Sequence, residues 1–384
     1  MDAQRATPRR RIMYLSGTRA DFGLMRSTLQ QASAHPGLTL DVAVTGTHLS
    51  PDHGNTVDEI QSAGFHVAAE IPVDVMTRTL ASMASAVGEC LKGMACVLET
   101  HRPDALVLLG DRGEMLAGAV AALHLGVPIV HIHGGERSGT VDEPVRHAIS
   151  KLSTWHLVAT EESAERLRRM GEDGQRIVVV GAPGLDGLTD LAAGTMHDTV
   201  AELQLPPSTP FVLALFHPVV QQADLARDQT IALMHALNAM ALPVVWLEPN
   251  ADAGALGVLQ ALDEGALPSG SRRVRHLDRA LFVRTMRHAV VMVGNSSAGI
   301  IEAATFGTPV VNVGDRQRLR ERNANVVDVP AEAAALTAAL RQAVQHGRFA
   351  CINRYGDGQA GRRIVEHLVQ MPLVHALQEK TNAY

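Results

Sequence analysis

The chain has 384 residues, more than one hydrophobic core usually organises, so two domains of roughly 150 to 200 residues are expected. Its apolar fraction of 46% comes mostly from Ala, Val and Leu, and only 3% of residues are aromatic, which favours parallel strands and packed helices over an all-β sandwich. The net charge of -6 excludes a global attraction to nucleic acid or to an anionic membrane, so any phosphate site must be local.

The N-terminal segment predicts neither a signal peptide nor a membrane span. Its apolar run is broken at Ser16 and Gly17 and is too short for either. The three cysteines, Cys90, Cys96 and Cys351, form no CxxC pair, so neither a disulfide framework nor a zinc site is indicated. We therefore expect a cytoplasmic protein.

Short apolar runs alternate with helical stretches in the first half of the chain. The runs that we read as strands are IMYLSG (12–17), LDVAVTG (40–46), ALVLLGD (105–111), PIVHIHG (128–134), HLVAT (156–160) and RIVVVGAPG (176–184). This alternation is typical of a doubly wound parallel sheet. In such a sheet ligands bind beyond the carboxyl ends of the strands, so the polar residues at those ends are site candidates as a group.

A second set of strands follows a stretch, residues 187 to 209, that lacks strong periodicity and ends in LPPSTP. These strands are FVLALFHP (211–218), LPVVWLEPN (242–250), VRHL (274–277), AVVMVGNSS (289–297) and PVVNVGD (309–315). Two Rossmann-like domains that face a central cleft describe the GT-B arrangement. We predict this α/β fold, with a first domain at 1–205, a UDP-binding domain at 206–360, and a C-terminal helix at 361–384 that could pack back on the first domain.

Two strand ends in the first half carry an arginine beside a turn. In GTRAD (17–21) the amides of a helix N-terminus and Arg19 can attract an anion, although a plain turn with a surface arginine is the alternative. In GDRGEMLAG (110–118) Asp111 lies on the turn and Arg112 is expected to point into the crevice. Capping of the next helix is the alternative, and compatible, role for Asp111.

The segment HIHGGERSGTVDEPVRH (131–147) gathers many titratable groups on a glycine-kinked loop at a strand end. A loop that merely connects two elements does not need them, so a functional site is favoured. The groups are His131, His133, Glu136, Arg137, Asp142, Glu143, Arg146 and His147. Pro144 also predicts a helix start here, with Asp142 or Glu143 near the N-cap.

The motif GNSSAGIIEA (294–303) reads as a strand, a turn and a helix. Backbone amides and the hydroxyls of Ser296 and Ser297 can cradle a diphosphate, and Glu302 can accept hydrogen bonds from ribose hydroxyls. A plain serine N-cap is the alternative. Because the motif lacks the lysine of a P-loop, ATPase chemistry is disfavoured.

Two further features of the second half face the same cleft. The dipeptide HP ends the first strand and places His217 at the cleft, although a lone histidine is more often structural. The run VGDRQRLRER (313–322) supplies Arg316, Arg318 and Arg320. At least one is expected to neutralise phosphate, and the others to form a solvated surface.

Together, GTRAD, GDR, HIHGGExSGTxDE followed by RHAISKLS, HP, PNADAG, GNSS followed by Glu, and VNVGDRQ resemble the hydrolysing UDP-N-acetylglucosamine 2-epimerases of bacterial sialic acid synthesis. The resemblance covers residues 11 to 365, and several motifs in the correct order are more specific than any one. Non-hydrolysing epimerases share the fold but differ in the HIHGGExSGT loop. The resemblance implies anti elimination of UDP to a 2-acetamidoglucal, then hydration with inversion at C2, which releases N-acetylmannosamine and UDP.

The resemblance also implies roles for individual residues. The candidate catalytic residues are Asp111, His133, Glu136, Asp142 and His217. The candidate UDP-sugar contacts are Arg19, Arg112, Glu143, Arg146, His147, Asn250, His276, Ser296, Ser297, Glu302 and Arg316. The implied chemistry needs neither a metal nor a redox cofactor. We expect no nucleic-acid or membrane partner, and a homo-oligomer, either a dimer or a tetramer.

His133 departs from the family pattern, since many members carry glutamate there, in HIEGGE. Imidazole exchanges protons near neutral pH but cannot offer the same negative charge to an oxocarbenium ion. Related enzymes of legionaminic acid synthesis, which act on UDP-2,4-diacetamido-2,4,6-trideoxyglucose, can carry histidine there, so that sugar is the alternative substrate. A non-hydrolysing epimerase, a GT-B glycosyltransferase and a non-catalytic nucleotide-sugar sensor are further alternatives.

Overall fold

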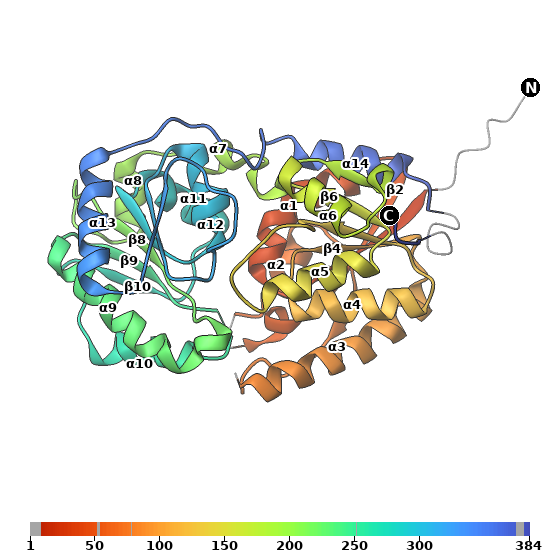
Figure 1. The fold of residues 1–384 in the computed structure, drawn as a ribbon, viewed down its shortest axis with the longest axis horizontal. Coiled ribbons are helices and arrows are strands. Elements are labelled where there is room, and N and C mark those ends of the chain that lie inside the picture. The colour runs from red at the N-terminus through yellow and green to blue at the C-terminus, as the bar shows by residue number, and fades with distance from the viewer. Residues whose placement is uncertain (1–8, 52–53, 78, 251, 374–379) are drawn as a thin grey trace, which may run out of the picture.

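Two parallel β-sheets, each flanked by helices, lie side by side in the computed structural model (Figure 1). The structure describes residues 9–51, 54–77, 79–250, 252–373 and 380–384. Each half alternates strands with helices along the chain. The predicted α/β class with two doubly wound, Rossmann-like domains is confirmed.

The first domain is built on a seven-stranded sheet of order β3-β2-β1-β4-β5-β6-β7. Its strands are β1 (Arg10–Ser16), β2 (Leu38–Thr45), β3 (Val67–Ile71), β4 (Ala105–Leu109), β5 (Ile129–Ile132), β6 (Trp155–Val158) and β7 (Ile177–Val179). Its helices are α1 (Arg19–Ala34), α2 (Val57–Ser62), α3 (Leu80–His101), α4 (Gly113–His124), α5 (Asp142–Leu152) and α6 (Glu161–Arg169). The central strands are buried on both faces, as their apolar runs require.

The second domain is built on a six-stranded sheet of order β10-β9-β8-β11-β12-β13. Its strands are β8 (Val212–Leu215), β9 (Val244–Leu247), β10 (Arg272–Val274), β11 (Val291–Gly294), β12 (Val310–Val313) and β13 (Val326–Val329). Its helices are α9 (Ala226–Met240), α10 (Ala255–Glu264), α11 (Arg279–His288), α12 (Ser297–Ile301) and α13 (Ala333–His346). All strand pairs in both sheets are parallel.

The chain crosses between the domains twice. On the first crossing it forms α7 (Leu188–Leu191) and α8 (Met196–Glu202), and Val200, Leu203 and Leu205 pack into the core of the second domain. The chain therefore joins the second core a few residues before the predicted boundary at residue 206.

On the second crossing the chain returns over the top of the molecule to α14 (Ala360–Gln370), which lies beside α1 (Figure 1). Ile364, Val365 and Leu368 of α14 are buried in the core of the first domain. Part of the predicted C-terminal segment, residues 374–379, lies outside the described residues.

Helix α3 is the one helix in the described part of the chain that is long and apolar enough to cross a membrane, by length and composition alone. A single helix of this kind is weak evidence for a membrane span. One face of α3 packs on the sheet through Cys90, Met94 and Leu98, as in the core of a globular domain.

Candidate active site

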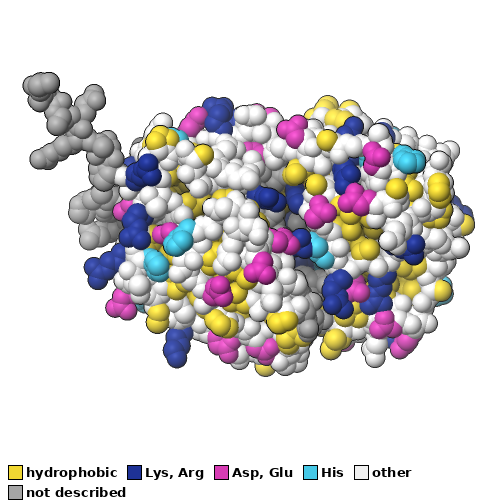
Figure 2. Space-filling view, turned by 180° about the vertical axis from the view of Figure 1, so that it is seen from behind, with side chains coloured by type: hydrophobic (Ala, Val, Ile, Leu, Met, Phe, Trp, Pro, Cys, Tyr) yellow, Lys and Arg dark blue, Asp and Glu magenta, His cyan; other side chains and the backbone are white. Residues whose placement is uncertain are grey.

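Each sheet reverses its strand order at one point, and the predicted motifs lie at these two points. In the first sheet β1 pairs with both β2 and β4, so the ends that carry GTRAD and GDR are neighbours. In the second sheet β8 pairs with both β9 and β11, so the ends that carry HP and GNSS are neighbours. Ligands of open α/β sheets bind at such reversals. Figure 2 shows charged side chains and histidine around the hollow between the two halves.

Two loops from opposite domains meet at this hollow. We call residues 133–141, between β5 and α5, the glycine loop, and residues 314–322, between β12 and β13, the arginine loop. The amide of Gly139 donates a hydrogen bond of 3.2 Å to the carbonyl of Arg316. A Cβ on Gly139 would collide with the carbonyl oxygen of Asp315, so the close approach of the two loops requires glycine.

The ion pair between Asp111 and Arg146 joins two of the predicted site residues. Asp111 follows β4, and Arg146 projects from α5 with only 1% of its side chain exposed. Arg146 also donates to the carbonyl oxygen of Glu136, at 3.0 Å. Helix α4 begins after Arg112 without a side-chain cap, so Asp111 does not take the alternative capping role. The carboxylate of Asp111 therefore interacts with Arg146 in the site and does not cap α4.

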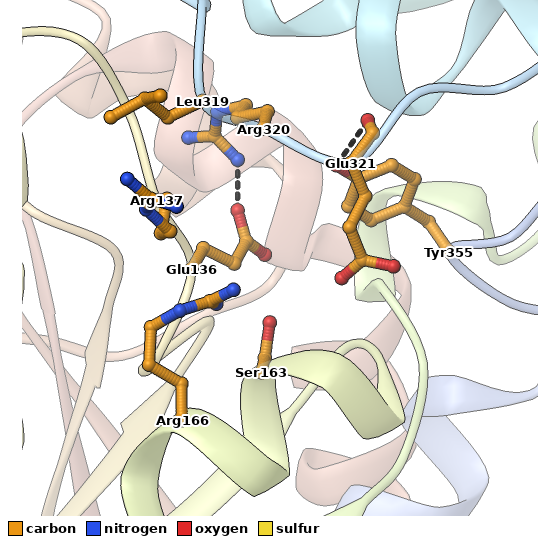
Figure 3. A pocket seen from close by; sticks show the side chains of 8 residues that line it. All are labelled: Glu136, Arg137, Ser163, Arg166, Leu319, Arg320, Glu321 and Tyr355. Atoms are coloured by element: carbon orange, nitrogen blue, oxygen red, sulfur yellow. Dashed lines mark hydrogen bonds and ion pairs between the residues drawn. The ribbon is translucent and has the colours of Figure 1, made fainter. Parts of the chain in front are cut away.

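The carboxylate of Glu136 is buried and holds two partners. One oxygen meets the Nδ1 atom of His133, and the other meets the guanidinium of Arg320, which reaches it from the arginine loop (Figure 3). Arg320 also lies 4.0 Å from the carboxylate of Asp111. The glycine and arginine loops thus share one group of charges.

His133 is held in a defined orientation and in its neutral form. Its φ of 63° lies in the left-handed region, which residues other than glycine seldom adopt and which is frequent at functional sites. Burial, and then the charge of Arg320, lower the pKa of His133 to about 3. Since Nδ1 faces the carboxylate of Glu136, we assign the proton to Nδ1, which leaves Nε2 with a free lone pair.

His217 is also neutral, but it has the opposite tautomer. Its Nδ1 accepts a hydrogen bond of 3.2 Å from the amide of Asn250, so the proton lies on Nε2. The side chain of Asn295 holds the backbone of His217 through two hydrogen bonds of 2.8 Å. Burial, and then the charge of Arg316, lower the pKa of His217 to about 3. His217 is therefore a neutral hydrogen-bond donor, whereas His133 is an acceptor.

The GNSS turn carries Ser296, which caps α12, and Ser297, which is partly exposed. Arg316 donates to the carbonyl of Asn295 at 3.3 Å and lies 3.9 Å from Asp142 on the first turn of α5. Glu302 is buried and forms an ion pair of 2.6 Å with Arg279.

The remaining predicted residues lie around this centre. Arg112 lies 3.4 Å from Glu114 in its own domain and 3.9 Å from Asp252 in the other. Arg19 pairs with Glu59. Partial removal of His276 from solvent, and then the charge of Arg19, lower the pKa of His276 to about 4.

Helix α5 carries the last two predicted contacts, Glu143 and His147. Glu143 accepts a hydrogen bond of 2.8 Å from the amide of Ser138 in the glycine loop. His147 lies 3.7 Å from Glu143, one turn further along the helix. Glu143 therefore holds the glycine loop against α5 in addition to any ligand contact.

Sequence reasoning missed Arg320 and Arg279. Arg320 was expected on a solvated surface, yet only 9% of its side chain is exposed. Arg279 lies outside the motifs described above, but it binds both Glu302 and the carbonyl of Gly184 in the first domain. No signal in the run RQRLRER distinguishes the buried Arg320 from the exposed Arg318.

Comparison with known proteins gives a consistent result. Residues 30–369 match the family model described as UDP-N-acetylglucosamine 2-epimerase. A UDP-N,N'-diacetylbacillosamine 2-epimerase (hydrolyzing) of Legionella pneumophila is 45% identical over 98% of this chain and 100% of its own length. A UDP-N-acetylglucosamine 2-epimerase of Neisseria meningitidis serogroup B is 32% identical over 91% of each chain.

The solved structures agree on the fold. The crystal structure of a Neisseria meningitidis UDP-GlcNAc 2-epimerase bound to UDP-GlcNAc superposes with a TM-score of 0.79, at 18% identity, over 94% of this chain and 100% of that one. A Methanocaldococcus jannaschii UDP-GlcNAc 2-epimerase in complex with UDP-GlcNAc and UDP gives a TM-score of 0.77, at 18% identity, over 93% of this chain and 99% of that one. The predicted GT-B-like arrangement is confirmed by these neighbours.

Proposed function

Because the chain belongs to the UDP-N-acetylglucosamine 2-epimerase family and is an enzyme that acts on a UDP-sugar, we propose that it is a hydrolysing 2-epimerase of UDP-2,4-diacetamido-2,4,6-trideoxyglucose. This sugar nucleotide is UDP-N,N'-diacetylbacillosamine. The 45% identity to the Legionella pneumophila enzyme of that name, over the whole of both chains, carries the proposal. A 30% identical relative in Campylobacter jejuni, named a GDP/UDP-N,N'-diacetylbacillosamine 2-epimerase (hydrolyzing), supports it.

The first step is the elimination of UDP. Nε2 of His133 takes the proton from C2 of the sugar, while the C1–O bond breaks and its electron pair leaves with UDP. Because the C2 proton is weakly acidic, bond breaking at C1 must run ahead, so positive charge develops on the ring. The carboxylate of Asp111 stabilises this charge. Nε2–H of His217 and the guanidinium of Arg316 stabilise the departing diphosphate.

The second step is the hydration of the resulting 2-acetamidoglucal. Water adds its hydroxyl to C1 and gives its proton to the carboxylate of Asp142, which delivers a proton to C2 on the face opposite to the one deprotonated by His133 and so inverts C2. The proton taken up by His133 is released to solvent. Asp142, near Arg316 on the first turn of α5, is the proposed acid on that face. The products are UDP and the free 2-epimeric sugar.

The experiment that tests the proposal is incubation of the purified enzyme with UDP-2,4-diacetamido-2,4,6-trideoxyglucose in deuterated water. We expect UDP and a free sugar that carries deuterium at C2, with proton couplings of the inverted configuration. A product still attached to UDP would instead identify a non-hydrolysing epimerase. No turnover, with tight UDP binding, would identify a nucleotide-sugar sensor.

The second candidate substrate is UDP-N-acetylglucosamine, favoured by the 32% identical Neisseria meningitidis relative. With this substrate the free product would be N-acetylmannosamine, as in sialic acid synthesis. Comparison of kcat/KM for the two UDP-sugars, and for the GDP analogue of the first, decides between them. A higher kcat/KM for UDP-N-acetylglucosamine would overturn the proposed substrate but not the reaction.

A further inference from the structure

Arg320 is a second-domain residue whose side chain lies inside the first-domain site. Its guanidinium forms an ion pair with Glu136 and lies 4.0 Å from Asp111, and 9% of the side chain is exposed. In the same loop, 62% of the side chain of Arg318 is exposed, and its ion pair with Asp315 measures 3.8 Å. The two arginines therefore differ sharply although they are two residues apart.

Together with Arg146, Arg320 balances the charge of two carboxylates, the partly buried Asp111 and the buried Glu136. Asp111 and Glu136 lie close enough to share Arg320, and two nearby carboxylates in a buried site disfavour ionisation of one another. Arg146 is supplied by the first domain and Arg320 by the second. Glu136 therefore receives its cation from the opposite domain, through the arginine loop that rests on the glycine loop.

His133 is the group that responds to this balance. His133 shares the carboxylate of Glu136 with Arg320. Because the charge of Arg320 partly neutralises this carboxylate, Glu136 stabilises a proton on His133 less strongly. The charge of Arg320 lowers the pKa of His133 in addition to burial. The titratable and charged groups that act on the ring are Glu136 of the same loop, Arg320 and His131 of β5. Around them, Asp111 lies near Arg320, Arg146 of α5 binds the carbonyl of Glu136, and Arg166 of α6 binds the carbonyl of Gly135.

We propose that Arg320 is a positioning residue that keeps His133 neutral and oriented as a base by occupying the second oxygen of Glu136 from the opposite domain. The proposal rests on the proposed function, because it gives His133 the role of base. It explains how imidazole can serve in a loop where many relatives carry glutamate. In an enzyme without Arg320, the carboxylate of Glu136 would interact with His133 without a competing cation and would stabilise the protonated form of His133.

The kinetic test compares Arg320→Met with Arg318→Met. For Arg320→Met we expect a loss in kcat of about 100-fold with less than about threefold change in KM, because the group acts on the chemical step. The acidic limb of the kcat–pH profile should move up by about two pH units or more, since the pKa of His133 rises from about 3 to above 5. Arg318→Met should leave kcat and the profile unchanged. Equal losses in both variants, or an unshifted profile in Arg320→Met, would overturn the proposal.

A second test does not depend on turnover. Titration of the labelled histidine ring by NMR, with His133→Asn to assign the signal, should show neutral His133 across pH 5 to 8 in the parent enzyme and a protonated form in this range in Arg320→Met. Arg320→Lys, which keeps the charge, should restore the neutral form in part. An identical His133 titration in the parent and Arg320→Met enzymes would disprove the proposal even if the enzyme acts on another sugar.

If Arg320→Met does not fold, the double variant Glu136→Gln/Arg320→Met replaces it in the test. In this double variant Glu136 is no longer left as a buried charge without its cation. If this double variant folds, its His133 should titrate as a neutral group, because the carboxylate that would hold the proton is gone. A protonated His133 in that variant would contradict the role given to Glu136.

Discussion

Arg146 on α5 and Asp111 after β4 form a buried ion pair that fixes a helix to the end of a strand. The guanidinium also binds the carbonyl of Glu136, so one side chain connects the turn after β4, the glycine loop and α5. This connection predicts that Asp111 has two separable roles, one in turnover and one in stability.

Asp111→Asn should lower turnover by about 100-fold or more, because an amide cannot stabilise positive charge at C1 as a carboxylate does. UDP binding should survive, since Asp111 is not among the proposed nucleotide contacts. The variant should also lose about 3 kcal/mol of stability, because Arg146 is left as a buried unpaired charge. UDP release, calorimetric UDP binding and urea unfolding measure the three effects. Asp228→Asn, whose side chain is 78% exposed, is the control and should match the parent enzyme.

Ser297→Ala should weaken UDP binding about fivefold, which corresponds to about 1 kcal/mol for one lost hydrogen bond. Ser296→Ala should act differently, because Ser296 caps α12. We expect it to lower stability by about 1 kcal/mol in addition to any effect on binding. Calorimetric titration with UDP and thermal unfolding separate the two serines. An unchanged UDP affinity in Ser297→Ala would show that Ser297 does not contact the diphosphate.

The stability of the fold should fall as the pH drops from 6.5. The pKa of His131 is lowered to about 3, with burial as the first cause, as it is for His133 and His217. The unfolded chain, with histidine pKa values of about 6.5, therefore binds more protons than the folded chain between these limits, and each such group can cost about 1.4 kcal/mol per pH unit. Urea unfolding at pH 7.5 and pH 5.0 measures the loss.

His131→Gln should reduce this pH dependence. In the parent enzyme Nε2 of His131 donates to the carbonyl of Gly110 at 2.7 Å, and Nδ1 lies 3.0 Å from the hydroxyl of Ser150, which can donate to the neutral ring. The exposed His124 is the matched control, and His124→Gln should keep the full pH dependence. The same slope in both variants would show that His131 does not contribute.

Lys380→Met should lower stability by about 2 kcal/mol, because buried Glu172 loses one of its cations. Lys380 donates to Glu172 at 2.5 Å, while Lys151 lies 2.7 Å from the other carboxylate oxygen. Urea unfolding of Lys380→Met and of Lys92→Met, an exposed position on α3, measures the difference. Equal stability of the two would mean that the C-terminal residues contribute nothing to the fold.

The sequence predicts the buried strands and the edge strand β7 well, and the edge strands β3, β10 and β13 poorly. The strands at the centre of each sheet are continuous apolar runs, because helices cover both of their faces. Strands β3 and β13 lie at the sheet edges and are largely half-buried or exposed, so their short runs gave no clear signal. Strand β10, also at an edge, covers Arg272–Val274 and overlaps the expected strand at 274–277 by one residue.

The motifs predict which strand ends face the hollow, but not the partners of each side chain. That Asp111 pairs with Arg146, and that Arg320 joins Glu136, depends on the angle between α5 and β4 and on the distance between the two domains. Such distances arise from packing between segments far apart in the chain. For the same reason, the buried Arg320 and the exposed Arg318 cannot be told apart in the run RQRLRER.

The return of α14 to the first domain affects the order in which the protein folds as it is made. The first domain lacks Ile364, Val365 and Leu368 until nearly the whole chain has been synthesised. The second domain needs the chain only as far as α13 to complete its core. We therefore expect the second domain to fold first on the ribosome, and the first domain, although it is synthesised earlier, to remain with an open apolar face that chaperones can bind until the C-terminal residues emerge.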